Sequence, residues 1–280
     1  MAKTTNTLKK RNAIIITIGI QKGGAGKTVA SCVFSYLISK EYKVLLVDAD
    51  PQGNSTETFT GKAVRTYRNT ETPGIMTAFL NNDAHMAIEE ITPSLHVLRG
   101  DERSGYFTNL FSDPETMAHY KNRDYLVEGL LKPLKLEYDF IIIDTGPMLG
   151  DLLTNCIIAS DHVITMYEPS KYCASALLSF DENIQEVKHR LNLDVDLTGI
   201  VISLIDARRV DNREHIEVLR GDNYFGPKCF NNFISRSAAA GRISSNGLIG
   251  NPEVRQAVKQ YIPILKELYE RVNTKTTSKH

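Results

Sequence analysis

Short apolar runs alternate with longer amphipathic segments along the 280-residue chain. The short runs contain few polar positions, as expected for strands that are buried on both faces of a parallel sheet. The longer segments, such as 27–40 and 173–191, place apolar residues at helical spacing. This alternation predicts an α/β fold with right-handed crossovers between parallel strands. The expected strands are residues 13–20, 43–48, 95–99, 139–144, 162–166 and 197–205.

The pattern also predicts the domain organisation. No internal repeat, low-complexity stretch or long linker interrupts the sequence, so we expect a single domain over residues 13–272. The polar ends, residues 1–12 and 273–280, are expected to be flexible, and the polar stretch 61–72 is expected to form a surface loop.

A C-terminal helix is indicated by a capping residue, Asn251, followed by Pro252 at the first helical position. A kink or break is expected near Pro263, because proline lacks the N–H that a helix interior needs. The apolar positions expected to carry this helix into the core are Val254, Val258, Leu265 and Leu268.

Composition narrows the class of protein. Lys+Arg and Asp+Glu each number 33, so total charge does not indicate a strongly basic nucleic-acid binder, although a local basic patch remains possible. The four cysteines are far apart and lie in or beside apolar stretches, which indicates reduced, buried thiols and not a zinc cluster or disulfide framework.

The first apolar run is too short to span a membrane and is typical of a strand, so we expect a cytoplasmic protein.

The most specific local signal is the segment 21–28, which reads Q-K-G-G-A-G-K-T and lies between an expected strand and an expected helix. Glycines let the backbone curl so that its N–H groups point at phosphate oxygens, and the helix N-terminus adds a favourable dipole. Lys27 would reach the β- and γ-phosphates, and the Thr28 hydroxyl would bind Mg²⁺. The alternative is a tight glycine-rich turn with two solvated lysines. The expected nucleotide contacts are Gly23, Gly24, Ala25, Gly26, Lys27, Thr28 and Val29.

Acidic residues end two other expected strands, at the sheet edge where doubly wound folds bind ligands. Four apolar residues precede Asp144, a pattern that matches a Walker B strand, and its carboxylate would hold Mg²⁺ through water. Gly146 could donate a backbone N–H to the γ-phosphate, so that its loop senses hydrolysis. Asp48 could bind in the same region or shape the turn by accepting backbone N–H bonds.

One departure from the ordinary phosphate loop is informative. Gln21 stands where that pattern has glycine, and a second lysine, Lys22, begins the loop. This K-G-G-x-G-K-T form resembles the deviant Walker A loop of the ParA/MinD class of ATPases. The segment 48–54 reads D-A-D-P-Q-G-N and resembles the D-x-D-P-Q-x-N segment of ParA proteins. The resemblance to the ParA/Soj family covers residues 14–272, and it implies a P-loop NTPase-type doubly wound, mostly parallel sheet with helices on both faces.

The resemblance assigns roles to individual residues. Lys22 would cross the interface of an ATP-bound homodimer and touch the partner's nucleotide in trans, while Lys27 acts in cis. Asp50 would lie near the attacking water and the metal. ATP is then the substrate and Mg²⁺ the cofactor, and slow turnover is expected because no strong general base is visible. The implied catalytic residues are Lys22, Lys27 and Asp50, and the implied metal site comprises Thr28, Asp50 and Asp144.

Later motifs match the family more loosely. Residues 168–174 occupy the place of the family's P-x-Q-x-E-x-x-A segment, and residues 199–208 are similar to its strand ending in Y-D-x-R. By this resemblance, Asp206 and Ser235 would line the adenine pocket. Gly146 stands where the family usually has proline.

Basic residues in the C-terminal half of ParA dimers bind DNA without sequence preference, and such binding is phosphate-driven. The alternative for this chain is a solvated, salt-bridged surface, since acidic residues lie nearby in the sequence. The candidate DNA contacts are Arg208, Arg209, Arg213, Arg236 and Arg242.

The resemblance therefore implies a switch. ATP would bring two subunits face to face, the dimer would bind nonspecific DNA on the nucleoid, and hydrolysis stimulated by a centromere-binding, ParB-like partner would release it. The sequence shows no added N-terminal region long enough for a helix-turn-helix domain, which is typical of the short ParA type. No membrane contact is expected.

Three other functions fit the sequence less well. A MinD-like membrane-positioning ATPase would end in a basic amphipathic helix, but residues 274–280 have no apolar face. Electron transfer, as in the nitrogenase iron protein, needs a second cysteine that could ligate an iron–sulfur cluster together with Cys156. The sequence has no second cysteine at a plausible matching position. A non-enzymatic adaptor with a decayed site is disfavoured by the intact Lys27, Thr28, Asp50 and Asp144.

Overall fold

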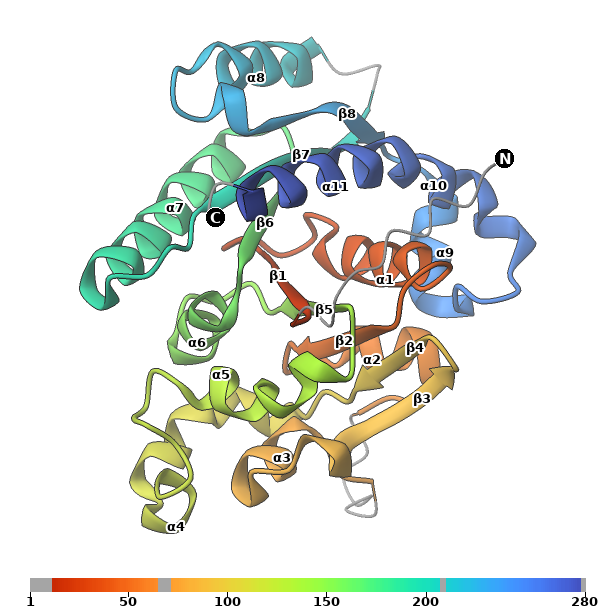
Figure 1. Ribbon diagram of the computed structural model, residues 1–280. Coiled ribbons are helices and arrows are strands. Elements are labelled where there is room, and N and C mark those ends of the chain that lie inside the picture. Colours follow the sequence, from red (N-terminus) through yellow and green to blue (C-terminus); the bar gives the residue numbers. More distant parts are fainter. Residues whose placement is uncertain (1–11, 65–71, 207–209, 278–280) are drawn as a thin grey trace.

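The structure is a computed structural model that describes residues 12–64, 72–206 and 210–277. An eight-stranded sheet with the order β3-β4-β2-β5-β1-β6-β7-β8 forms its centre (Figure 1). Only β3 and β4 pair in an antiparallel sense, and the other neighbours are parallel. The strands are β1 (Ile14–Gly19), β2 (Val44–Ala49), β3 (Ile88–Thr92), β4 (Leu95–Leu98), β5 (Phe140–Thr145), β6 (His162–Tyr167), β7 (Leu197–Ile205) and β8 (Cys229–Ser235).

All six expected strands are present, with ends within one residue of the prediction. The predicted doubly wound, mostly parallel sheet in a single α/β domain is confirmed. Side chains along the central strands alternate between two hydrophobic cores, one on each face. In β5, for example, Ile142 enters one core while Ile141 and Ile143 enter the other. Burial on both faces explains why these strands read as continuous apolar runs.

Helices cover both faces of the sheet (Figure 1). The core that receives Ile142 also contains apolar residues of α1 and α11, and the opposite core contains those of α3 and α5. The α-helices are α1 (Lys27–Ile38), α2 (Asn54–Thr60), α3 (Ile75–Asn81), α4 (Pro114–Met117), α5 (Leu126–Leu131), α6 (Asp151–Ala159), α7 (Lys171–Leu191), α8 (Val210–Gly221), α9 (Ala238–Asn246), α10 (Arg255–Lys259) and α11 (Tyr261–Thr277). Short 3₁₀ helices are η1 (Ala84–Ala87), η2 (Glu102–Ser112), η3 (Pro133–Leu136), η4 (Gly226–Lys228) and η5 (Pro252–Val254).

The C-terminal segment differs in detail from the prediction. The Asn251 side chain accepts a hydrogen bond from the N–H of Glu253 at 3.0 Å, as expected for a cap. The helix then breaks at Gln260, before Pro263 and not at it. Pro263 lies in the first turn of α11, where its missing N–H removes no helical hydrogen bond. The same helix runs to Thr277, so helical backbone extends into the end that was expected to be flexible.

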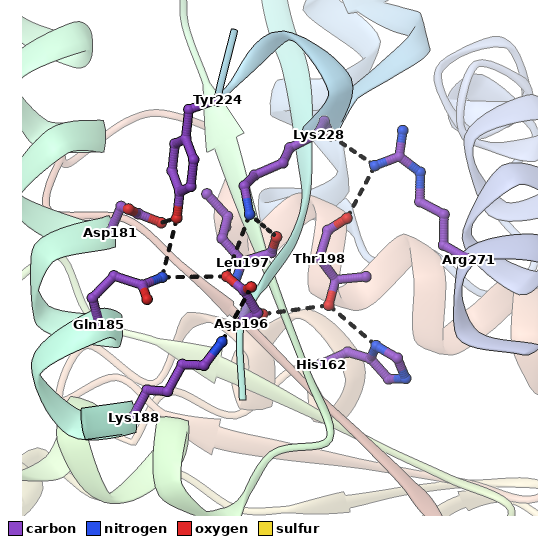
Figure 2. A network of polar contacts seen from close by, with 10 residues as sticks. All are labelled: His162, Asp181, Gln185, Lys188, Asp196, Leu197, Thr198, Tyr224, Lys228 and Arg271. Carbon is purple, nitrogen blue, oxygen red and sulfur yellow. Dashed lines mark hydrogen bonds and ion pairs between the residues drawn. The ribbon is translucent and has the colours of Figure 1, made fainter. Parts of the chain in front are cut away.

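A polar network lies at the amino-terminal ends of β6 and β7 (Figure 2). Asp196, just before β7, is within 3.5 Å of Lys188 Nζ and 3.3 Å of Lys228 Nζ. The guanidinium of Arg271, on α11, donates to the carbonyl oxygens of Thr198, Lys228 and Cys229 at 2.7–3.0 Å. These bonds attach the last helix to the strand ends furthest from the glycine-rich loop.

Candidate functional site

The glycine-rich loop connects β1 to α1 at the carboxyl end of the sheet. Gly24 and Gly26 adopt φ of 75° and 87°, in the left-handed region that favours glycine. A Cβ atom at Gly23, Gly24 or Gly26 would meet no atom within 4 Å, so this backbone faces open space. That space is a cavity of about 520 Å³, and the residues from Gly23 to Val29 all line it. Its size is typical of a small-molecule site.

Lys27 begins α1 at the edge of this cavity and is only 6% exposed. Its ammonium donates to the carbonyl oxygen of Lys22 at 2.9 Å. Burial lowers the pKa of Lys27, against the opposing influence of Asp144 and Asp50. A buried cation that is hydrogen-bonded to a neutral carbonyl oxygen is suited to receive an anion.

Asp144 is the next-to-last residue of β5 and is fully buried. Its carboxylate accepts hydrogen bonds from Ser55 Oγ at 2.6 Å and Ser31 Oγ at 3.0 Å. Burial raises its pKa to about 6, although hydrogen bonds from Ser55, Ser31 and Thr28 act in the opposite direction. A buried carboxylate beside a threonine hydroxyl is a suitable oxygen site for a divalent cation.

Two further carboxylates lie at the carboxyl end of β2, Asp48 within the strand and Asp50 directly after it. Asp50 lines the cavity, is 6% exposed, and accepts a hydrogen bond from the Gln52 N–H at 2.9 Å. Asp48 is fully buried and accepts hydrogen bonds from the Thr56 N–H and hydroxyl at 2.8 and 2.7 Å. Burial and the charge of Asp144 raise the pKa of Asp48 to about 7. Asp48 thus shapes the turn into α2, while Asp50 faces the cavity.

Several predicted nucleotide contacts lie beside the cavity and not on its wall. Gly146 lies next to Asp50, because a Cβ on Gly146 would be 3.5 Å from Asp50 Oδ1. Asp206 lines a smaller cavity of about 240 Å³. The backbone N–H of Ser235 donates to Gln260 at 2.8 Å. Lys22 forms an ion pair with Glu168 at 2.5 Å.

The part of the cavity wall outside the phosphate loop includes residues that sequence reasoning missed. Leu204, at the end of β7, has a φ of 56°, a conformation that leucine rarely adopts, and it borders both cavities. Met166, Ile234 and Tyr261 add apolar surface. Ile234 is the one with a sequence signal, since it directly precedes Ser235, which was expected to line the adenine pocket.

The three candidate DNA contacts that the structure describes are not gathered into one patch. Arg236 lines both cavities, and Arg242 on α9 pairs with Glu253 at 3.3 Å. Arg213 is exposed on α8, which lies apart from α9 in Figure 1. Arg208 and Arg209 lie outside the described residues.

Comparison with known proteins identifies the family. The family model described as AAA domain matches residues 13–197, which is more than half of the chain. The chromosome partitioning protein ParA of Myxococcus xanthus is 29% identical over 276 residues, covering 94% of this chain and 90% of that protein. The sporulation initiation inhibitor protein Soj of Bacillus subtilis is 29% identical over 267 residues, covering 91% and 97%. The chain belongs to the ParA/Soj family of AAA-domain ATPases.

The fold of this ParA/Soj-family ATPase agrees with solved structures. The crystal structure of a plasmid partition protein from Borrelia burgdorferi bound to AMPPNP superposes with a TM-score of 0.74 at 26% identity. The match covers 92% of this chain and 99% of that one. Across the described part of the chain, no helix combines the length and apolar character that crossing a membrane requires.

Proposed function

We propose that this chain is an ATP-hydrolysing DNA-partition protein. ATP and Mg²⁺ assemble it into a dimer, the dimer binds nonspecific DNA, and hydrolysis stimulated by a centromere-binding partner releases the DNA. The observation that carries this proposal is the open glycine loop with a buried lysine at one end, Lys27, and a second lysine at the other, Lys22. The family relationship and the AMPPNP bound by the Borrelia relative support ATP as the ligand.

The residues beneath the loop suit a magnesium ion. Thr28, Asp50 and Asp144 supply hard oxygen ligands, and Mg²⁺ usually takes one or two carboxylates, with waters and phosphate oxygens completing its shell. Asp144 and Asp50 are also the acidic groups whose charges raise the pKa of Lys27, against the effect of burial. When bound, the ion would neutralise negative charge on the β- and γ-phosphates.

Hydrolysis on this site depends on positioning and electrostatics. The N–H groups of the loop and the dipole of α1 bind the phosphates, and Lys27 neutralises charge that develops during transfer. Asp50, on the cavity wall, orients the attacking water. Catalysis by positioning and charge neutralisation, without a strong general base, would give slow turnover in the absence of a partner.

Dimer formation would complete the site and create the DNA surface. Lys22 of each subunit reaches the nucleotide of the other. Arginines from both subunits, among them Arg213, Arg236 and Arg242, then contact DNA phosphates, and two weak surfaces joined in one dimer bind more tightly than either alone. When hydrolysis removes the γ-phosphate, its bonds to the protein, including one from the Gly146 loop, are broken and the subunits separate.

The proposal is tested by DNA binding at several salt concentrations, with ATP, with ADP and without nucleotide, each with Mg²⁺. We expect binding with ATP only, and an affinity that falls steeply with salt. If Arg242 of each subunit binds one DNA phosphate, Arg242→Ala removes two contacts from the dimer and should reduce the slope of log affinity against log salt by about 2. Lys259→Ala, at an exposed lysine of α10, should leave the slope unchanged. DNA binding that is equal with ATP and ADP would contradict the switch.

A further inference from the structure

Glu168 joins two cations that come from different parts of the fold. It follows the last residue of β6 and is about one-fifth exposed, at 21%. Its Oε2 atom is 2.5 Å from Lys22 Nζ, and its Oε1 atom is 2.9 Å from Arg236 Nη2. Each carboxylate oxygen therefore has its own cationic partner.

Lys22 is attached to its own subunit at both ends. Besides Glu168, its ammonium donates to Ser170 Oγ at 3.3 Å, at the start of α7. Its carbonyl oxygen accepts the hydrogen bond from Lys27 at 2.9 Å. The ammonium that the proposed dimer needs on a partner's phosphates is thus held on the β6–α7 turn of the same chain.

Arg236 gives Glu168 a connection to the nucleotide cavity. It lies after β8, borders both cavities, and its backbone N–H donates to Ile205 O at 2.9 Å. The Arg236 guanidinium neutralises part of the Glu168 charge. By holding one carboxylate oxygen, it also orients the other oxygen toward Lys22. Glu168, just after β6, therefore connects Lys22 of the phosphate loop with Arg236 on the cavity wall.

We propose that Glu168 is a latch on Lys22, which holds this lysine in the resting subunit and sets the threshold for dimer formation. This inference rests on the proposed function, because it concerns the release of Lys22 for use in trans. In this latch, the ammonium leaves Glu168 when it binds the phosphates of a second subunit. Dimerisation therefore exchanges an ion pair with a carboxylate for one with a polyphosphate, which carries more negative charge.

Removing the latch charge should favour the dimer. In Glu168→Gln the amide cannot form an ion pair, so Lys22 is released at lower cost. The contact is charge-assisted but partly solvated, and we expect the dimer dissociation constant to fall by about 5- to 10-fold. A residue with a purely structural role would not strengthen association when it is substituted.

The experiment is sedimentation velocity over a protein concentration series, with Mg²⁺ and a non-hydrolysable ATP analogue. Wild type, Glu168→Gln and the matched control Glu182→Gln, at an exposed position on α7, are compared. We expect tighter dimerisation in Glu168→Gln alone, and no dimer when Lys22→Gln is added to it. Equal or weaker dimerisation of Glu168→Gln relative to Glu182→Gln would overturn the latch.

Wild type separates failure of the latch from failure of the proposed function. If wild type forms no dimer at any concentration with the analogue, the proposed function fails. If wild type dimerises and Glu168→Gln matches the control, only the latch fails. Thermal unfolding without nucleotide shows whether Glu168→Gln folds. If it does not, Glu168→Asp, which keeps the charge but shortens the reach, should shift dimerisation in the same direction by a smaller factor, and no shift would overturn the latch.

Discussion

Both ends of the parallel strands carry buried or half-buried charged side chains, but the pKa values of these side chains are shifted in opposite senses at the two ends. At the amino-terminal end, burial alone would raise the pKa of Asp196, yet the charges of Lys228 and Lys188 lower it (Figure 2). At the carboxyl end, burial raises the pKa of Asp144 to about 6 and lowers that of Lys27. The charge of Asp196 is thus compensated by lysines of the same chain, whereas burial dominates the pKa values of Asp144 and Lys27.

This difference separates structural polar groups from functional ones. A network whose charges are paired adds stability and fixes the relative position of helices and strands. Charges held in a buried site without full compensation cost stability, and that cost is recovered when a ligand of suitable charge binds. The amino-terminal network should therefore affect folding alone, and the carboxyl-terminal cluster should affect nucleotide binding and hydrolysis.

The largest effect is expected at the phosphate loop. Lys27→Met removes the buried ammonium and keeps an apolar stem of similar length. We expect kcat/KM for ATP hydrolysis to fall by at least about 100-fold, because a charge that stabilises the transferring phosphoryl group is removed. Steady-state kinetics provides the measurement, with Lys259→Met as control. A melting temperature well below that of wild type would show that Lys27 is structural and would break the comparison.

Arg271 provides the matching test at the other end of the sheet. Arg271→Ala leaves the carbonyl oxygens of Thr198, Lys228 and Cys229 without their donor, and it removes the guanidinium from above the Phe230 ring. We expect unfolding free energy to decrease by about 2 kcal/mol in denaturant titrations. Nucleotide affinity of the folded protein should stay unchanged. Arg255→Ala, at an exposed position on α10, should change neither quantity.

The raised pKa of Asp48 predicts that the stability of the folded chain depends on pH. This pKa is raised to about 7 in the folded chain, above the ordinary value of 3.8, so the folded state binds the proton more tightly than the unfolded state. The corresponding stability is fully present below about pH 4 and is lost as the pH rises through about 7. The nucleotide-free protein should therefore lose several degrees of melting temperature between about pH 6 and pH 8 through this group. Asp48→Asn should show a smaller loss, and an equal loss in both proteins would contradict the assignment.

The smallest effect is expected within the amino-terminal network. Lys188 is 3.5 Å from Asp196 and its side chain is 32% exposed, while Lys228 pairs with the same carboxylate. Lys188→Ala should reduce unfolding free energy by only about 0.5 kcal/mol, because Lys228 continues to neutralise Asp196 and the Lys188 pair is solvated. A loss as large as that of Arg271→Ala would show that the network acts as one cooperative unit.

Much of the fold could be predicted because its strands carry their signal locally. Residues 140–143 are apolar without interruption, since both faces of β5 are buried. β3 is different: it is a half-exposed edge strand that contains Glu89 and Glu90, and its pattern is not distinctive. A break was expected near Pro263, and it lies at Gln260, three residues earlier, because proline is tolerated in the first turn of a helix and does not itself fix the boundary.

Part of the candidate site could likewise be predicted from the sequence, and part could not. The phosphate loop could be predicted because glycines and lysine at fixed spacing specify both the backbone and the chemistry. The apolar part of the cavity wall could not, because Met166, Leu204 and Tyr261 come from three distant segments that meet only in the folded chain. The pairing of Lys22 with Glu168 escapes sequence reasoning for the same reason, since the two residues are 146 positions apart.

The most direct test of the account concerns Lys22. Wild type, Lys22→Gln and the control Lys259→Gln are each mixed with Mg²⁺ and a non-hydrolysable ATP analogue, and nucleotide binding and molecular mass are measured on the same samples. We predict that all three bind the nucleotide, and that wild type and the control form dimers while Lys22→Gln stays monomeric. A Lys22→Gln protein that dimerises as wild type does would contradict the claim that this lysine completes the site of a second subunit.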